Sequence, residues 1–504
     1  MTATARAPQD GREATGLADV GVWGLGTMGG QLALNLAEHG FRVALHNRSH
    51  ERVAALLAGE RGRPWADKLN GTRDTGAFVA AIAPPRRILL MVPAGTAVDD
   101  SITELLPLLS AGDVVVDGGN SLYSDTDRRQ RQLLERSVAF LGCGVSGGAH
   151  GARHGPSLMV GGDPVAYALM APLLEAIAAE GEGGRCLALL GRDGAGHFAK
   201  MVHNGIEYAD MQLLAEAYDL LQRGLGLPTA RIAEIFAAWN TGPLESFLLE
   251  LAARVARRSD RASGRPLLEL VDDAAAQKGT GRWTVQAALD LGVAVPTLAA
   301  GVDARTLSAH RNLRSAAAAA WSGPDPQAAP GWLATALGDA DRALDAVHDA
   351  LHAARLVACA QGLQLVGAAS DAHGWGTDRA ELARIWTGGC ILRARSLSLV
   401  RAAFTRDRQL SNLALDPAIA AILHETQPRW RALVAAAVTG GLPVAALASA
   451  LSWYDTLRSR SLPTNLTQAQ RDAFGAHGFR RRDRLQGPPE FADWETDPPR
   501  TPGV

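Results

Sequence analysis

The amino-acid sequence predicts an α/β domain built on a doubly wound parallel sheet, followed by a large all-α domain and a C-terminal tail. In roughly the first 190 residues, short apolar runs alternate with helical patterns, as parallel strands and crossover helices require. After about Gly194, Ala- and Leu-rich segments of helical period follow one another with few strand-like runs. Beyond Ser461 the chain becomes polar and then Pro-rich, a composition that adds little to a core.

These changes of texture divide the 504 residues into four parts. We expect a disordered N-terminal extension (1–17), a sheet-containing domain (18–193), an all-α domain (194–460) and a tail (461–504). The expected strands are Val20–Trp23, Phe41–Leu45, Ile88–Val92, Val114–Asp117 and Ala139–Cys143. The apolar stretch from Ala432 to Tyr454 is interrupted at residues 439–443, which predicts two buried helices joined by a turn instead of a membrane span.

Composition argues against several classes of partner and site. The formal net charge of −2 disfavours a nucleic acid or an anionic membrane held by bulk charge. The four cysteines are scattered, without a Cys-x-x-Cys pair, which indicates a reduced, cytoplasmic protein. The N-terminus lacks the apolar segment of a signal peptide. His, Cys, Asp and Glu show no metal-ligand spacing, so we expect a metal-free mechanism.

The first expected strand runs into a Gly-x-Gly-x-x-Gly turn and then a helix, the order of a Rossmann-type dinucleotide site. Gly24 permits the tight turn, Gly26 admits the pyrophosphate to the backbone, and Gly29 lets helix and strand pack closely. Taken alone, the motif also fits an incidental glycine-rich turn. Arg48 follows the second strand, where NAD-binding proteins place an acid on the ribose, so this position favours the 2′-phosphate of NADP over NAD. An ordinary surface arginine is the alternative.

More glycine-rich segments follow later strands. Residues 117–121 and 144–148 both lie after strands at the edge of the sheet where open α/β sheets bind ligands. Their small residues leave backbone N–H groups free to reach a carboxylate or hydroxyls. Lys278 and Thr280 lie in a glycine-rich turn of the kind that holds phosphate. Turns without any ligand remain the alternative for each segment.

The stretch Lys200–Tyr208 carries one polar face. Its polar residues recur at i, i+3, i+4, i+7 and i+8, which places them on the same side of a helix. A solvated face would carry several long charged side chains, whereas this one holds single Lys, His, Asn, Glu and Tyr groups in an apolar neighbourhood. We therefore expect it to face a bound ligand, with a satisfied buried hydrogen-bond network as the alternative.

Together these segments resemble 6-phosphogluconate dehydrogenase (decarboxylating), a family of the β-hydroxyacid dehydrogenase superfamily. Matching segments run almost end to end and include GVSGGAHGARHGPSLM, WNTGPLESFLLE, IWTGGCILR and NLTQAQRDAFGAH. The Gly-Thr-Gly turn and the Gln-Arg-Asp tail are narrower signals than the shared superfamily motifs, and they point to the phosphorylated sugar acid. The resemblance implies NADP-dependent oxidative decarboxylation of 6-phosphogluconate to ribulose 5-phosphate and carbon dioxide, a step of the oxidative pentose phosphate pathway and of gluconate utilization.

The resemblance also implies roles for individual residues. Lys200 would be the general base for the carbon 3 hydroxyl, and Glu207 the acid that protonates carbon 1 of the enediol; both need shifted pKa values. His203 and Asn204 would orient the reacting oxygens. The cofactor-binding residues would be Gly24, Leu25, Gly26, Thr27, Met28, Gly29, Asn47, Arg48, Ser49, Val92 and Asn120. The further substrate-binding residues would be Asn120, Ser146, Gly147, Gly148, Tyr208, Lys278, Thr280, Arg305, Arg471 and His477.

In this family the segment that holds Arg471 and His477 comes from the neighbouring subunit, so the resemblance implies a homodimer whose tails complete each other's active sites. Some positions depart from the family pattern: a lysine is missing from residues 92–95, Ala149 and His150 replace two acids, and Thr387 replaces an arginine. Two alternatives stay open. One is a non-decarboxylating dehydrogenase of a shorter β-hydroxy acid, and the other is a non-catalytic NADP or sugar-phosphate sensor.

Overall fold

The computed structural model describes residues 16–325 and 330–495. The expected disordered extension therefore lies, apart from its last two residues, outside the described residues, as do the last nine residues of the expected tail. The described chain divides into two compact units, one ending at Ala450 and the other beginning at Leu451.

The first unit opens with an eight-stranded sheet in the order β3-β2-β1-β4-β5-β6-β7-β10. Neighbouring strands are parallel except β6 and β7, which are antiparallel. The strands are β1 (Val20–Trp23), β2 (Val43–His46), β3 (Leu69–Gly71), β4 (Arg87–Leu90), β5 (Val114–Asp117), β6 (Ala139–Val145), β7 (Leu158–Gly161) and β10 (Leu187–Leu189). The predicted doubly wound α/β domain is confirmed, with the expected strands shifted by at most two residues at their starts or ends.

The sheet departs from parallel order at one junction, between β6 and β7. Residues 146–157, which include the seven-residue helix α6 (Gly148–His154), connect β6 to β7. At about 1.5 Å per residue this helix spans about 10 Å, whereas a seven-residue strand such as β6 spans about 23 Å. A parallel crossover usually needs a dozen or more residues, so this connection is at the lower limit, and β7 instead runs antiparallel beside β6.

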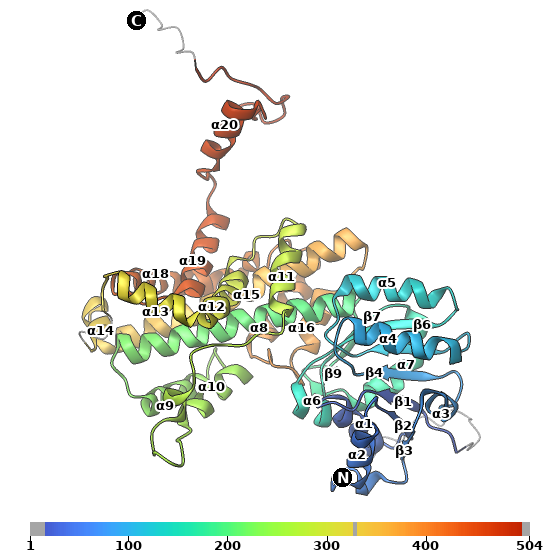
Figure 1. Ribbon diagram of the computed structural model, residues 1–504. Helices are drawn as coiled ribbons and strands as arrows, with labels where there is room; N and C mark the ends of the chain where they lie inside the picture. Colours follow the sequence, from blue (N-terminus) through green and yellow to red (C-terminus); the bar gives the residue numbers. More distant parts are fainter. Residues whose placement is uncertain (1–15, 326–329, 496–504) are drawn as a thin grey trace, which may run out of the picture. The chain divides into compact units, whose positions relative to one another are not determined.

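Helices cover both faces of this sheet (Figure 1). One buried cluster joins α1, α2 and α7 to the sheet, and a second joins α3, α4 and α5. Val20 and Val22 of β1 belong to the first cluster and Trp23 to the second, because successive side chains of a strand point to opposite faces. The helices are α1 (Gly29–Glu38), α2 (His50–Ala58), α3 (Thr75–Ala80), α4 (Thr96–Leu105), α5 (Tyr123–Leu134) and α7 (Pro164–Ile177).

The rest of the first unit is helical, as predicted. A two-stranded hairpin of β8 (Glu180–Gly181) and β9 (Gly184–Arg185) lies between α7 and β10, ahead of this helical part. The 25-residue helix α8 (Ala195–Asp219) leaves the sheet and packs against β6, β7, α11, α12 and α15 (Figure 1). The remaining helices are α9 (Thr229–Trp239), α10 (Phe247–Arg257), α11 (Thr280–Asp290), α12 (Pro296–Ala309), α13 (Arg311–Ala320), α14 (Trp332–Leu337), α15 (Ala340–His373), α16 (Arg379–Ile385), α17 (Ser396–Arg406), α18 (Pro417–Thr439) and α19 (Ala445–Arg458).

The apolar stretch that resembles a membrane span is divided as expected. Helix α18 ends at Thr439 and α19 begins at Ala445, so two helices are joined by a short turn. Across residues 16–325 and 330–495, none of the helices has the length and apolarity needed to cross a bilayer.

The second unit begins within α19 and contains α20 (Thr464–Gly475) and an extended segment that folds back on it. Phe479 and Glu490 form an antiparallel bridge, and the rings of Phe479 and Trp494 lie 5.8 Å apart. The side chain of Asp472 is 4% exposed and accepts hydrogen bonds from the backbone of Gly478, at 2.8 Å, and from the Trp494 indole, at 2.7 Å. The tail thus has a polar centre of its own.

Candidate active site

The polar face of α8 is turned toward the protein interior. Lys200 is 6% exposed, His203 is fully buried, and the Glu207 side chain is 17% exposed. A Cβ at Gly144 of β6 would lie only 2.4 Å from the Cβ of Lys200, so the missing side chain lets α8 approach the sheet. The indole of Trp386 packs edge-on against His203, with ring centroids 5.3 Å apart. Water is therefore largely excluded from this face.

The amine of Lys200 donates a hydrogen bond to Ser146 Oγ at 3.1 Å. Ser146 follows β6 in the Gly-Val-Ser-Gly-Gly turn, so the contact joins the sheet to the helical part. Burial lowers the pKa of Lys200 below its ordinary value, although the negative charge of Glu207 opposes this shift. An amine that loses its proton more readily than a solvated lysine suits a general base.

His203 lies between Ser146 and the next residues of α8. Its Nε2 lies 3.4 Å from Ser146 Oγ, and its Nδ1 lies 3.2 Å from Asn204 Oδ1. Burial and the nearby charge of Lys200 hold the pKa of His203 well below its usual range. The imidazole is therefore neutral at neutral pH and can exchange hydrogen bonds without adding a second positive charge.

Glu207 lies one helical turn beyond His203, with Oε2 at 3.9 Å from His203 Nδ1. Burial raises the pKa of this carboxyl, while the positive charges of Lys200 and Arg305 oppose the increase. A carboxylic acid that keeps its proton to higher pH can serve as a proton donor. The same helix therefore holds an amine that is easier to deprotonate and an acid that is harder to deprotonate.

The predicted phosphate-binding residues gather at the C-terminal side of this face. The Arg305 guanidinium lies 3.5 Å from the centre of the Tyr208 ring, and the Lys278 backbone N–H donates to the Tyr208 hydroxyl at 3.4 Å. Asn204 Nδ2 donates to Thr280 Oγ1 at 3.1 Å, which links this cluster to the proton-transfer groups. The side chain of Lys278 is exposed at the rim, and Thr280 begins α11.

The other predicted substrate contacts lie at the carboxyl ends of adjacent strands. Gly147 caps α6 with φ 92°, and Gly148 begins the helix with φ 60°, so both adopt a conformation that favours glycine. Asn120 follows β5 and is exposed. Within the described part of the chain, it makes no hydrogen bond to the α8 side chains.

The Gly-x-Gly-x-x-Gly turn has the geometry that a dinucleotide requires. A Cβ at Gly29 would lie 1.9 Å from the carbonyl oxygen of Gly24, whereas one at Gly26 would make only an ordinary van der Waals contact, with its nearest neighbour 3.9 Å away. The side chain of Asn47 accepts a hydrogen bond from the Leu25 backbone at 2.9 Å, which joins the turn to the end of β2. The predicted cofactor residues Gly24, Leu25, Gly26, Thr27, Met28, Gly29, Asn47, Arg48, Ser49 and Val92 all belong to this turn or to the ends of β2 and β4.

Sequence reasoning missed Arg52. The neighbour of Gly26 just described is Nη1 of Arg52, which lies in the first turn of α2, four residues after Arg48. Arg48 therefore lies in the β2–α2 connection and Arg52 in the first turn of α2, beside the glycine-rich turn. The spacing of four residues between Arg48 and Arg52 was the available signal for a second arginine at the cofactor site. This spacing can be interpreted only when the position of the glycine-rich turn is known.

The departures from the family pattern have local structural roles. Thr387 donates to the carbonyl of Arg384 at 2.7 Å and accepts from the backbone of Glu182 at 2.9 Å, so it ties the end of α16 to the β8–β9 hairpin. A Cβ at Gly24 would lie 3.0 Å from Val92 Cγ1, which makes Val92 a wall of the dinucleotide turn.

Arg471 and His477 belong to the second compact unit. Arg471 donates to Gln468 at 3.1 Å, and His477 packs against Phe474 with ring centroids 6.0 Å apart. Both are exposed within the described tail. The predicted role of these residues in a neighbouring subunit is not tested by a single chain.

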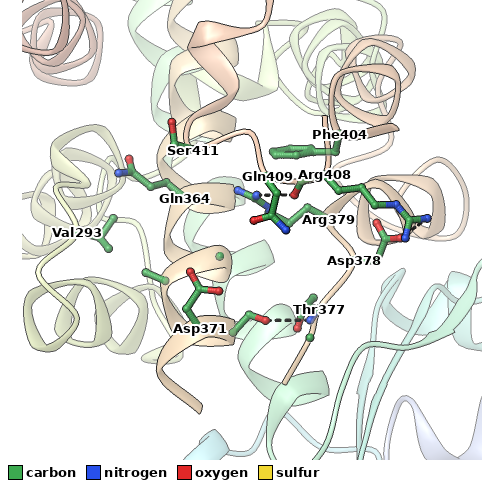
Figure 2. Close-up of a pocket in the computed structure, with 14 residues that line it drawn as sticks. Val293, Gln364, Asp371, Thr377, Asp378, Arg379, Phe404, Arg408, Gln409 and Ser411 are labelled. Atoms are coloured by element: carbon green, nitrogen blue, oxygen red, sulfur yellow. Dashed lines mark hydrogen bonds and ion pairs between the residues drawn. The ribbon is translucent and has the colours of Figure 1, made fainter. Parts of the chain in front are cut away.

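A cavity of about 510 Å³ lies elsewhere in the helical part (Figure 2). Its walls come from α15, the α15–α16 loop and the end of α17, and they include Asp371, Arg379 and Phe404 but none of the predicted site residues. Among the described residues, no three or more His, Cys, Asp or Glu side chains are grouped to hold a metal ion. The metal-free mechanism stays a prediction.

Comparison with known proteins gives one consistent result. Residues 19–191 match the family model "NAD binding domain of 6-phosphogluconate dehydrogenase", and residues 196–494 match "6-phosphogluconate dehydrogenase, C-terminal domain". The chain is 45% identical over 470 residues to the decarboxylating 6-phosphogluconate dehydrogenase of Synechococcus elongatus, covering 93% of this chain and 98% of that protein. It is 43% identical over 465 residues to the NADP(+)-dependent, decarboxylating enzyme of Bacillus subtilis, covering 92% and 97% respectively.

A solved structure is also similar. The 6-phosphogluconate dehydrogenase of Plasmodium falciparum, described with its cofactor NADP+ and with its substrate 6-phosphogluconate, aligns with a TM-score of 0.88 at 34% identity. The alignment covers 94% of this chain and 100% of that chain.

Proposed function

Because this chain belongs to the 6-phosphogluconate dehydrogenase family, we propose that the buried face of α8 is its proton-transfer centre, with Lys200 as base and Glu207 as acid. The protein is an NADP-dependent oxidoreductase that converts 6-phosphogluconate to ribulose 5-phosphate and carbon dioxide. The single observation that carries the residue assignment is the buried amine of Lys200, 3.1 Å from Ser146 Oγ and with a lowered pKa.

In this mechanism Lys200 accepts the proton of the carbon 3 hydroxyl. Its lowered pKa increases the fraction of neutral amine at neutral pH, and neutral amine is the form that can act as a base. Bound NADP would supply the acceptor for the hydride that leaves carbon 3. The hydrogen-bonding groups of His203 and Asn204 orient the reacting oxygens, since a general base must lie within hydrogen-bond reach of its proton.

Loss of carbon dioxide uses the same amine in its protonated form. The Lys200 ammonium polarises the new carbonyl at carbon 3, so the electrons of the bond between carbons 1 and 2 can pass into it. Glu207, whose pKa is raised by burial, then donates a proton to the terminal carbon of the enediol, which becomes carbon 1 of ribulose 5-phosphate. Lys200 gives its proton to the carbon 3 oxygen as the enediol forms and takes it back as Glu207 protonates the terminal carbon. Lys200 then releases this proton to solvent, and Glu207 is reprotonated from solvent.

Two ends of the site would hold the ends of the substrate. Ser146, Gly147, Gly148 and Asn120 offer hydrogen-bond groups to the carboxylate and the nearest hydroxyls. Tyr208, Lys278, Thr280 and Arg305 offer two cations and two hydroxyls to the phosphate, a combination suited to charge-assisted hydrogen bonds. An unphosphorylated shorter β-hydroxy acid would leave these cations without a partner, which disfavours that alternative.

The residues beside the glycine-rich turn fit NADP. Arg48 is exposed after β2, and among the described residues its guanidinium makes no ion pair or hydrogen bond. It can therefore bind the 2′-phosphate, with Arg52 close to the turn.

Replacing Arg48 by alanine is expected to raise KM for NADP about 10- to 100-fold and to change KM for NAD little. This corresponds to the loss of about 1.5–3 kcal/mol, typical of a hydrogen bond to a charged group. Initial-rate kinetics with both coenzymes would test it. Arg42→Ala is the matched control, because Arg42 is exposed at the opposite end of β2. Equal effects of Arg48→Ala on both coenzymes would contradict the assignment.

We further propose that the protein is a cytoplasmic homodimer of the pentose phosphate pathway, in which the tail supplies Arg471 and His477 to the partner's active site. The proposal is supported by the compact tail, in which Asp472 accepts hydrogen bonds from Gly478 and Trp494.

Asp472→Ala is expected to raise KM for 6-phosphogluconate more than it lowers kcat, because it removes the acceptor that orders the tail. The fluorescence of Trp494 should shift to longer wavelength as its indole loses the carboxylate partner. Asp483→Ala is the control, since Asp483 forms only an exposed ion pair with Arg481 in the same tail. Unchanged KM despite the fluorescence shift would show that the tail does not contribute to the site.

The overall activity is tested by one assay. Purified protein with 6-phosphogluconate and NADP should form NADPH and release one carbon dioxide per NADPH. Binding of both ligands without turnover at any pH would instead support the non-catalytic sensor.

A further inference from the structure

Two histidines one helical turn apart lie exposed on α6. His150 and His154 occupy positions i and i+4, and their ring centroids are 4.7 Å apart with the planes inclined by 46°. Both side chains are exposed, and over the described ranges neither imidazole makes a hydrogen bond or an ion pair. Their nitrogen lone pairs are therefore accessible from the same side of the helix.

This arrangement is one that binds transition metals. Two histidines at i and i+4 on one helix face supply two of the ligands in the zinc-binding His-Glu-x-x-His motif. Imidazole also suits nickel and copper. We propose that His150 and His154 form a surface site for a divalent transition-metal ion, with water completing the coordination shell. The site is separate from the proton-transfer groups, and it requires no metal in the reaction.

The neighbouring charges permit such a site. Arg153, the nearest cation in sequence, is engaged by the carboxylate of Glu38 of α1, which offsets its charge. The ion would link the first and last turns of α6. Helix α6 directly follows the Ser146–Gly148 turn, and its Arg153 pairs with Glu38 of α1, the helix that follows the glycine-rich turn. A bound ion would therefore stabilise a helix that connects the proposed substrate-binding turn to the proposed cofactor-binding helix.

A second histidine pair in the same chain provides a contrast. His348 and His352 of α15 share the i, i+4 spacing, but their ring centroids are 6.4 Å apart. His348 Nδ1 is engaged by Asp349 at 3.2 Å, and burial lowers the pKa of His352 to about 4. Spacing alone therefore does not make a site here, because these imidazoles are partnered or withdrawn from solvent.

Equilibrium dialysis of the untagged full-length protein against Ni²⁺ at pH 7.5 tests the proposal. We expect one ion bound per chain, with binding weakened at least about tenfold in both His150→Gln and His154→Gln, a loss of about 1.4 kcal/mol. His348→Gln should bind as the unaltered protein does. Since protons compete with metals for imidazole nitrogen, acidification should release the ion.

The two single variants also guard against a folding artefact. Each should retain its circular dichroism spectrum and its rate of NADPH formation, because neither histidine belongs to the proposed catalytic or binding groups. The proposal would be overturned if the unaltered protein bound no Ni²⁺. It would also be overturned if either α6 variant bound Ni²⁺ as tightly as the unaltered protein, or if His348→Gln weakened binding as much as the α6 variants do.

Discussion

Lys200→Met is expected to lower kcat for oxidation of 6-phosphogluconate by about 10³-fold, within the range typical of a lost general acid or base. The methionine side chain is close in length to that of lysine and tolerates burial, so the packing of α8 against Gly144 should persist. Stopped-flow and steady-state measurements of NADPH formation would determine the loss, and thermal unfolding would report on the fold.

The chain offers two matched controls, because it contains only three lysines among its 50 Lys and Arg residues. Lys278→Met should mainly raise KM for 6-phosphogluconate, since Lys278 is placed at the phosphate end. Lys68→Met should leave both constants unchanged, because Lys68 lies over the Trp65 ring beside α1, away from the α8 face. Near-native kcat in Lys200→Met would rule out Lys200 as the base.

Glu207→Gln is expected to lower the rate of ribulose 5-phosphate formation by about 10²-fold or more, because the amide cannot donate the proton that the carboxylic acid supplies. Oxidation and loss of carbon dioxide precede this step, so the enediol should accumulate or protonate slowly from water. Tritium or deuterium incorporation at carbon 1 should lose its stereospecificity, which is the diagnostic readout.

A second buried glutamate on the same helix is the control for Glu207. Glu216 is 2% exposed, its pKa is raised by burial, and it accepts the backbone N–H groups of Ala446 and Leu447 at the start of α19. Glu216→Gln should lower the unfolding temperature and leave the stereospecificity intact. Stereospecific protonation in Glu207→Gln would contradict the role of Glu207.

The directions of the two pKa shifts predict the pH dependence. Lys200 must be neutral, so activity should fall as pH decreases through its lowered pKa. Glu207 must be protonated, so activity should fall as pH increases through its raised pKa. The profile should be bell-shaped, with apparent values that belong to the interacting pair. In Glu207→Gln the loss at high pH should disappear while the loss at low pH remains.

Much of the fold follows from local patterns. The glycine-rich turn, the first five predicted strands and the division into α/β and α parts depend on short-range spacing, and the structure has them within a few residues. β3, β7 and β10 were not predicted; β3 and β10 have only three residues each, and β3 (Leu69–Gly71) contains a single apolar side chain. The reversal at β7 goes with the short connection from β6, and the length of this connection is known only when both strands are placed.

The candidate site divides in a similar way. The spacing of α8 places Lys200, His203 and Glu207 on one face whatever the rest of the chain does, since a helix has a fixed period. The lysine itself is informative, because arginine cannot be deprotonated in proteins and could not replace it as a base. The position of Arg52 beside Gly26 could not be predicted without the folded turn.

The sequence alone determined which chemical groups share a helix face and which glycine-rich turns expose their backbone N–H groups. Both features depend on residues that are neighbours along the chain. Only the tertiary structure decided how those groups titrate. Ser146 and Trp386 reach α8 from segments 54 and 183 residues away from Lys200 and His203 respectively. Desolvation by such distant segments shifts the pKa values of the amine and the carboxyl, and no local pattern encodes it.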